Sequence, residues 1–124
     1  MRVAMIGTGY VGLVSGACFA DFGHEVVCLD KDEAKIEALR GGKMPIFEPG
    51  LPELVAANVR AGRLTFTDDL ASGVRHAEAV FIAVGTPSRR GDGHADLSFV
   101  YAAARAIAAE LTGHAVIVTK STVP

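Results

Sequence analysis

The sequence has no tryptophan and only two cysteines, Cys18 and Cys28, among its 124 residues. Two cysteines are too few for a disulfide framework, and neither stands in a Cys-x-x-Cys pair or a Cys/His cluster with the spacing of metal ligands. Free cysteine is usually buried in a protein core. We therefore expect two buried thiols and no metal site.

Long apolar runs and a strong excess of one charge are also missing. No stretch approaches the roughly 20 apolar residues of a membrane span, and the N-terminus does not have the charged and apolar regions of a signal peptide. The formal net charge is only -2, which argues against a nucleic-acid partner held by bulk charge. Hydrophobic residues make up 50% of the chain, enough for one buried core. We expect a cytoplasmic protein with a small-molecule partner and no membrane or nucleic-acid partner.

Short apolar runs alternate with segments in which apolar residues recur at helical spacing. The runs predict strands over residues 2–6, 25–30, 63–67, 79–84 and 115–119. The helical patterns cover residues 10–22, 32–40, 51–59 and 97–111, and residues 67–69 cap a brief helix that ends near residue 74. This alternation predicts an α/β fold, a Rossmann-type doubly wound parallel sheet with strand order 3-2-1-4-5, in a single domain over residues 1–124.

The chain ends five residues after the last predicted strand, which we take for a central strand, and no covering helix follows it. A central strand of a doubly wound sheet is normally covered by helices on both faces. We therefore expect the domain to be the first part of a larger polypeptide.

A Gly-x-Gly-x-x-Gly pattern, formed by Gly7, Gly9 and Gly12, joins the first predicted strand to the first predicted helix. Asp30 ends the next strand 18 residues later, the context of a dinucleotide-binding turn. In that interpretation Gly7 makes the turn, Gly9 lets the backbone approach a pyrophosphate, and Gly12 lets the helix pack close to the strand. The alternative is a tight turn that holds no ligand.

Two residues near this turn have alternative interpretations. Asp30 can accept hydrogen bonds from the ribose hydroxyls of an adenosine, which would favour NAD over NADP, or it can cap the helix that starts near Asp32. Lys35 can reach the ribose or a phosphate, but its spacing favours a solvated charge paired with Glu33 or Glu37.

Small and hydroxyl-bearing residues follow two of the predicted strands. Gly85 and Thr86 follow one strand, and Ser121 and Thr122 follow the last, so both pairs lie at the carboxyl edge where open α/β sheets bind ligands. Ordinary strand termination is the alternative. The four histidines, His24, His76, His94 and His114, have no triad or metal spacing. Arg89 and Arg90 could contact a phosphate, but a basic pair flanked by glycine favours a solvated loop, and the spacing around Glu48 assigns it no role.

Four short motifs, "GYVGL", "EPGL", "VGTP" and "KSTVP", occur in this order. Together with the opening segment they resemble the UDP-glucose/GDP-mannose dehydrogenase family, and the resemblance covers essentially the whole chain. It implies an NAD-dependent enzyme that oxidises the C6 hydroxyl of a nucleotide sugar to a carboxylate in two steps, with two NAD⁺ and a cysteine thiohemiacetal intermediate. UDP-glucose, oxidised to UDP-glucuronate, is the substrate that we favour.

The resemblance also assigns roles to residues. It implies that Tyr10, Val11 and Gly12 line the pyrophosphate, that Asp30 and Lys35 hold the adenosine ribose, and that Thr86 and Thr122 lie against the nicotinamide half. Thr122 is the one residue with a possible auxiliary role in catalysis. The catalytic cysteine of the family, its lysine and asparagine partners and the uridine-binding residues come from segments beyond residue 124, and neither Cys18 nor Cys28 matches that cysteine.

We therefore expect this chain to bind NAD without oxidising a sugar by itself. The nucleotide sugar and a homo-oligomeric assembly are expected only for the longer enzyme. Two alternatives stay open: the NAD-binding domain of a dehydrogenase for another nucleotide sugar, such as a UDP-N-acetylhexosamine or GDP-mannose, and a stand-alone module that senses NAD or NADH.

Overall fold

The structure is a computed structural model that describes residues 1–122. Val123 and Pro124, the last two residues of the KSTVP motif, lie outside the described residues. In chain order the elements are β1 (Arg2–Ile6), α1 (Tyr10–Asp21), β2 (Glu25–Leu29), α2 (Glu33–Arg40), α3 (Leu51–Arg60), β3 (Leu64–Thr67), α4 (Leu70–Arg75), β4 (Ala79–Ile82), α5 (Ser98–Glu110) and β5 (Val116–Thr119).

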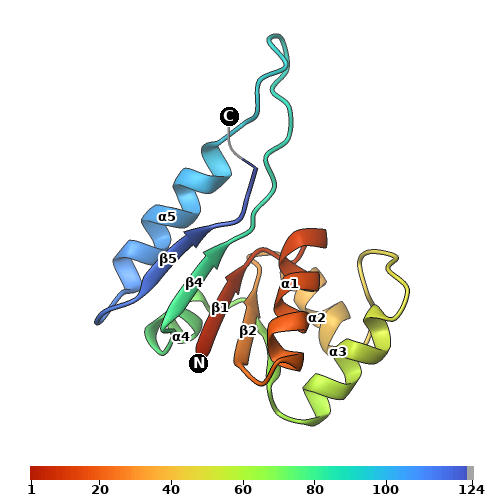
Figure 1. Cartoon of the computed structure of the whole chain (residues 1–124). Helices are drawn as coiled ribbons and strands as arrows, with labels where there is room; N and C mark the ends of the chain where they lie inside the picture. The colour runs from red at the N-terminus through yellow and green to blue at the C-terminus, as the bar shows by residue number, and fades with distance from the viewer. Residues whose placement is uncertain (123–124) are drawn as a thin grey trace.

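All neighbouring strands run parallel, and the sheet has the order β3-β2-β1-β4-β5. This confirms the predicted fold class and strand order. β1 lies in the middle, and its residues Val3 to Ile6 are buried because helices cover both faces of the sheet. Figure 1 shows the helices distributed over the two sides of the sheet.

The two faces carry separate apolar clusters. On one face α1, α2 and α3 pack against the sheet through residues such as Leu13, Ile36 and Val55. On the other face the cluster joins Val74 of α4 and Ile107 of α5 to Ile82 of β4. Fixing the strands from both sides holds their carboxyl ends in one row, and the turns that follow these ends build the site.

The observed elements differ from the predicted ones mainly at their ends. β4 stops at Ile82, two residues before the apolar run ends, although Ala83 still donates its N–H to the Ile6 carbonyl of β1 at 2.8 Å. The last strand is not central among the described residues: as the predicted order 3-2-1-4-5 requires, β5 is the outer strand of the sheet within residues 1–122, and Val116 is 54% exposed. Apolar content alone does not separate a central strand from an edge strand.

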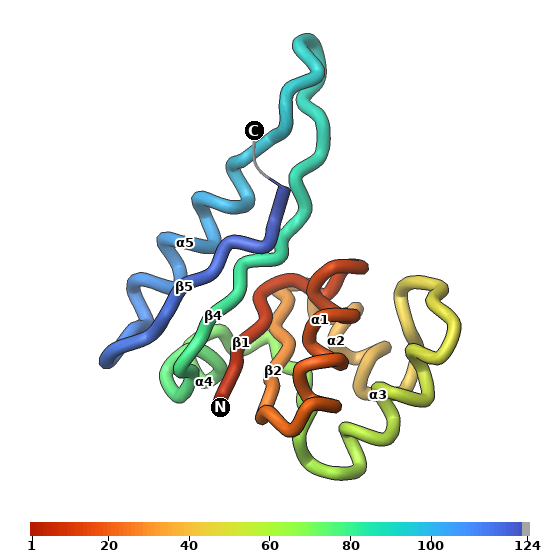
Figure 2. Tube along the Cα trace, viewed as in Figure 1, coloured from red at the N-terminus to blue at the C-terminus, as the bar shows by residue number. Residues whose placement is uncertain are grey.

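Residues 86–97 form an extended hairpin that projects beyond the carboxyl ends of the strands, as Figures 1 and 2 show. Backbone bonds join its two arms: Arg89 N–H donates to the His94 carbonyl (2.7 Å), and Asp96 N–H donates to the Pro87 carbonyl (2.7 Å). The side chain of Arg89 is not merely solvated as predicted, since it pairs with Asp92 at 2.6 Å.

None of the helices within residues 1–122 has the length and apolar character required to cross a membrane.

Candidate functional site

A cleft of about 690 Å³ opens at the carboxyl edge of the sheet, between the turn after β1, the end of β2 and the first turns of α5. This volume lies within the roughly 300–1,000 Å³ of small-molecule sites. The structure brings nine of the predicted cofactor-binding residues to its walls: Gly7, Gly9, Tyr10, Val11, Asp30, Lys35, Gly85, Thr86 and Thr122. The tenth, Gly12, is buried behind the turn.

The three glycines of the turn face different surroundings. Gly7 has a φ of +107°, and a Cβ on it would lie 2.5 Å from the carbonyl oxygen of Ala83. A Cβ on Gly12 would overlap the carbonyl oxygen of Gly7, so only glycine lets α1 start this close to β1. A Cβ on Gly9 would meet no atom within 4 Å, because Gly9 faces the open cleft.

The N-terminus of α1 points its backbone donors at the cleft. Gly9 is the N-cap residue and offers no side-chain acceptor, and the first turn contains no acidic residue. The first N–H groups of a helix have no partner within the helix, and together with the helix dipole they form a site for an anion. The open space at Gly9 would admit a phosphate to these groups.

The carboxylate of Asp30 is fixed by the turn that it faces. Its Oδ2 accepts hydrogen bonds from the Thr8 N–H (3.1 Å) and the Thr8 hydroxyl (2.7 Å), and its Oδ1 accepts one from the Asp32 N–H (3.0 Å). A carboxylate offers about four acceptor positions. The Asp30 carboxylate is therefore held in a fixed orientation at the end of β2. Its Oδ1 can still accept one more hydrogen bond from a donor in the cleft.

The environment of Asp30 also keeps it ionised. Partial burial alone would raise its pKa, but the hydrogen bonds from Asp32 and Thr8 and the positive charge of Lys35 outweigh burial, so the pKa is lowered. A permanent negative charge at this position would accept hydrogen bonds from ribose hydroxyls and repel a 2′-phosphate.

Asp32, not Asp30, is the N-cap of α2. Its side chain accepts from the N–H groups of Ala34 (3.0 Å) and Lys35 (3.3 Å), which leaves Asp30 free of that role. Lys35 lines the cleft, and within residues 1–122 its ammonium forms no ion pair with Glu33 or Glu37. The nearby acid Glu37 pairs instead with Arg40 at 3.0 Å.

The other end of the cleft lies where β4 and β5 end. The hydroxyl groups of Thr86 and Thr122 are hydrogen-bonded to each other. Ser121 holds the two chain segments together, since its hydroxyl donates to the carbonyl oxygen of Val84 at 2.9 Å. Small residues and hydroxyls therefore form this wall, which can take a flat polar ring.

The anion site, the preset acid and the hydroxyl wall lie along one continuous cleft and fit a dinucleotide. Residues 1–124 match the sequence pattern of the UDP-glucose/GDP-mannose dehydrogenase family, NAD binding domain. The chain belongs to this family. NAD is its cofactor, as the turn and Asp30 predicted.

Individual members of the family show how far the likeness extends. The chain is 73% identical to a UDP-glucose 6-dehydrogenase of Rhizobium meliloti over all of its 124 residues, and it spans 28% of that protein's length. A crystal structure of GDP-mannose dehydrogenase from Pseudomonas aeruginosa, a ternary complex, superposes with a TM-score of 0.94 at 37% identity and covers 99% of this chain and 29% of that one. A UDP-glucose dehydrogenase from Pyrobaculum islandicum gives a TM-score of 0.91 at 43% identity, covering 98% and 29%.

Several residues of the cleft were not found from the sequence of this dehydrogenase-family domain. Thr8 is fully buried and supplies two of the three donors to Asp30, but a single threonine between glycines has no periodic signal. Lys31 and Phe99 meet at the end of the cleft where β2 ends, with the Lys31 Nζ 5.3 Å from the ring centroid. These residues are 68 positions apart, and only the sheet order brings them together.

The two cysteines of this family member differ in burial. Cys28 is fully buried under α1, where a Cβ on Gly16 would lie 2.7 Å from its Sγ, and burial raises the pKa of its thiol to about 12. Cys18 is only partly buried, so the prediction of two buried thiols holds for Cys28 alone.

We expect Cys28 to resist alkylation while the domain is folded. The thiolate is the reactive form, and a pKa near 12 leaves about a thousand-fold less of it at neutral pH than in the unfolded chain. Brief treatment with iodoacetamide, followed by peptide mass spectrometry, should modify Cys28 only when denaturant is present. Equal modification of the native protein would contradict the buried, protonated thiol.

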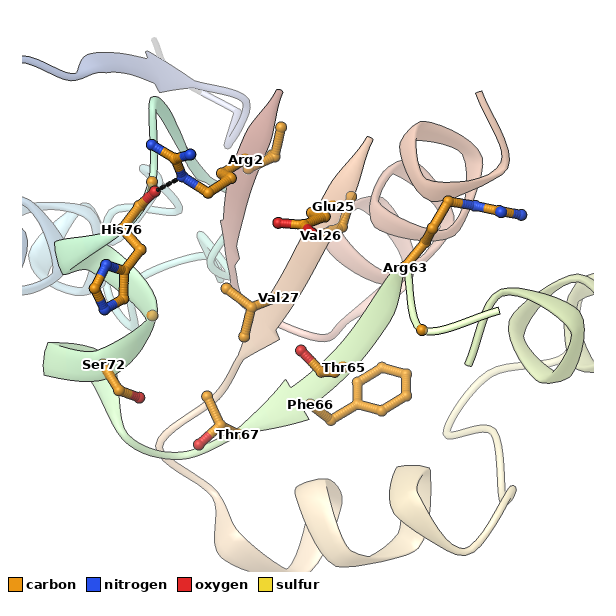
Figure 3. Close-up of a pocket in the computed structure, with 14 residues that line it drawn as sticks. Arg2, Glu25, Val26, Val27, Arg63, Thr65, Phe66, Thr67, Ser72 and His76 are labelled. Carbon is orange, nitrogen blue, oxygen red and sulfur yellow. Dashed lines mark hydrogen bonds between the residues drawn. The ribbon is translucent and has the colours of Figure 1, made fainter. Parts of the chain in front are cut away.

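A second cavity, of about 450 Å³, lies on the face of β2 and β3 next to α4. Figure 3 shows Val27, Thr65 and Thr67 along the strands and Ser72 and His76 on the helix side, with the Arg2 side chain donating to the His76 carbonyl at 2.6 Å. This cavity is separate from the carboxyl edge, and it contains none of the residues predicted for the cofactor.

Proposed function

We propose that this chain holds NAD in the cleft at the carboxyl edge and forms the cofactor half of an enzyme that oxidises the C6 hydroxyl of UDP-glucose to UDP-glucuronate. The observation that carries the cofactor site is the fixed Asp30 carboxylate beside the free N–H groups of α1. The substrate rests on the 73% identity to a UDP-glucose 6-dehydrogenase.

The proposed roles follow from the walls of the cleft. The N–H groups of Tyr10 and Val11 hold the pyrophosphate, with Gly7 and Gly12 shaping the turn and Gly9 leaving room. Asp30 and Lys35 hold the adenosine ribose, and Gly85, Thr86 and Thr122 face the nicotinamide. When bound, NAD supplies the hydride acceptor, and the residues of this chain orient it.

The sugar chemistry depends on residues outside this chain in this proposal. The chain spans 28% of the R. meliloti relative, and neither of its cysteines is suited to the family's nucleophile, since Cys28 is buried and protonated and Cys18 lies within α1. A cytoplasmic location and a homo-oligomeric assembly of the longer enzyme remain predictions.

The test has two parts. The purified chain is titrated with NAD in a calorimeter, and a separate assay measures whether the chain forms NADH. We expect saturable binding of NAD and no NADH from NAD⁺ and UDP-glucose. Absence of NAD binding would overturn the proposed cofactor site. Turnover of UDP-glucose by the chain alone would overturn the proposal that the sugar chemistry needs residues outside this chain.

A second candidate substrate class has structural support. Solved relatives include the GDP-mannose dehydrogenase and UDP-N-acetyl-mannosamine dehydrogenases, with TM-scores of 0.94 and 0.93 for two of them. The NAD-binding domain is thus nearly the same for different sugars. Assays of the longer enzyme on UDP-glucose, GDP-mannose and a UDP-N-acetylhexosamine would separate these substrates.

A further inference from the structure

The EPGL turn, which the sequence left without a role, contacts the glycine turn in the folded protein. The hydroxyl of Tyr10 donates a hydrogen bond of 3.0 Å to Oε2 of Glu48, across 38 residues of sequence. Tyr10 is the first residue of α1 and lines the cofactor cleft. Glu48 therefore contacts the side chain of the first residue of α1, the helix whose N–H groups face the cleft.

The backbone of Glu48 is held in a hydrogen-bonded turn at the start of α3. Its carbonyl accepts the N–H of Leu51 at 3.1 Å, which closes the turn at the start of α3. Gly50 has a φ of +82° within this turn, and Leu51 is buried against the core that α1 and α3 share. The backbone of Glu48 is thus fixed to α3, and its carboxylate can fix the more exposed Tyr10.

The charge of Glu48 strengthens this contact. The hydrogen bond to Glu48, and then its negative charge, raise the pKa of Tyr10, so the protonated phenol that donates to Glu48 persists to a higher pH than in a free tyrosine.

We propose that Glu48 is a positioning residue of the cofactor site, which acts through Tyr10 to hold the first turn of α1 in the geometry that binds a pyrophosphate. This inference rests on the proposed function, because it concerns the same cleft. It joins the GYVG and EPGL motifs into one structural unit.

The test compares NAD affinity and thermal stability of four variants with the unchanged chain. Tyr10→Phe and Glu48→Ala each remove the contact and should weaken NAD binding about five-fold, a loss within the range of a typical net hydrogen bond and below that of a buried charged one, because the contact is exposed to solvent. The double variant should lose no more than either single variant. Glu48→Gln retains an acceptor and should restore most of the affinity.

Glu53→Ala is the matched control, since it removes an exposed carboxylate from the first turn of α3. We expect unchanged affinity for this control and melting temperatures close to that of the parent for all variants. Unchanged affinity in Tyr10→Phe and Glu48→Ala, while the parent binds NAD, would overturn the inference alone. So would additive losses, or a loss in Glu48→Gln equal to that in Glu48→Ala. A parent chain that binds no NAD would overturn the proposed function itself.

Discussion

Replacing Gly12 by alanine should destabilise the domain by about 3 kcal/mol or more, a large part of the stability of a domain of this size. The added methyl group would overlap the carbonyl oxygen of Gly7, which is backbone and cannot rotate away. α1 would have to move off β1, and the turn between them would open. Thermal unfolding followed by circular dichroism should show the melting temperature lowered by more than about 10 °C.

Gly9→Ala is the matched control for this substitution, and it separates folding from binding. Gly9 has a φ of -75°, which alanine adopts freely, and an added Cβ would meet no atom within 4 Å. The melting temperature should stay within about 2 °C of the parent. Affinity for NAD should fall about ten-fold or more, because the methyl group occupies the space through which a phosphate approaches the N–H groups. A stable Gly12→Ala, or a Gly9→Ala that binds NAD normally, would contradict these roles.

Asp30→Asn should weaken NAD binding at least about ten-fold and narrow the preference for NAD over NADP. It should also cost about 1–2 kcal/mol of folding stability at neutral pH. Asp30 accepts hydrogen bonds on both carboxylate oxygens, from Thr8 and from Asp32, whereas an amide has one acceptor oxygen and would turn its NH₂ group toward another donor. Calorimetric titration and chemical denaturation measure the two effects.

The stability difference between the parent and Asp30→Asn should depend on pH. Because the pKa of Asp30 is lowered in the folded state, its stabilisation is fully present above its unfolded pKa of about 3.9 and is lost as the pH falls through the lowered folded value. The two proteins should therefore converge in stability in acid. A constant difference down to the acid-unfolded state would contradict the shift.

Asp32→Asn is the control for Asp30→Asn, because it removes the same charge two residues away. Asp32 caps α2 through Oδ1, and asparagine caps a helix as well as aspartate does. We expect both NAD affinity and stability to stay close to those of the parent. A loss of affinity equal to that of Asp30→Asn would show that negative charge at this end of the cleft matters more than the position of Asp30.

The sequence predicted the fold because strand and helix periodicities differ and a parallel sheet limits the possible strand orders. It predicted the glycine turn for a similar reason, since Gly7 and Gly12 occupy positions that a side chain cannot occupy. It could not decide whether Asp30 or Asp32 caps α2, because two aspartates before a helix give the same local signal. Hydrogen-bond geometry settles this in favour of Asp32.

Contacts between segments that are distant in the chain could not be predicted from the sequence. The bond from Tyr10 to Glu48 and the contact of Lys31 with Phe99 each join the first turns of a helix to a turn distant in sequence, and only the assembled sheet brings them together. Spacing alone made Lys35 a surface charge, and its position became clear only when α2 was placed against the end of β2. The apolar residues of β5 resemble those of a buried strand, so only the predicted strand order, and not the composition of this segment, placed β5 at the edge.

We expect copies of this chain to meet in concentrated solution along the outer side of β5. Within residues 1–122 no strand pairs with this side, and Val116 and Ile117 are both more than 40% exposed along it. An open, apolar strand edge is a template for further strands, so an encounter at this edge would extend the sheet. We therefore expect concentrated samples of the chain to self-associate.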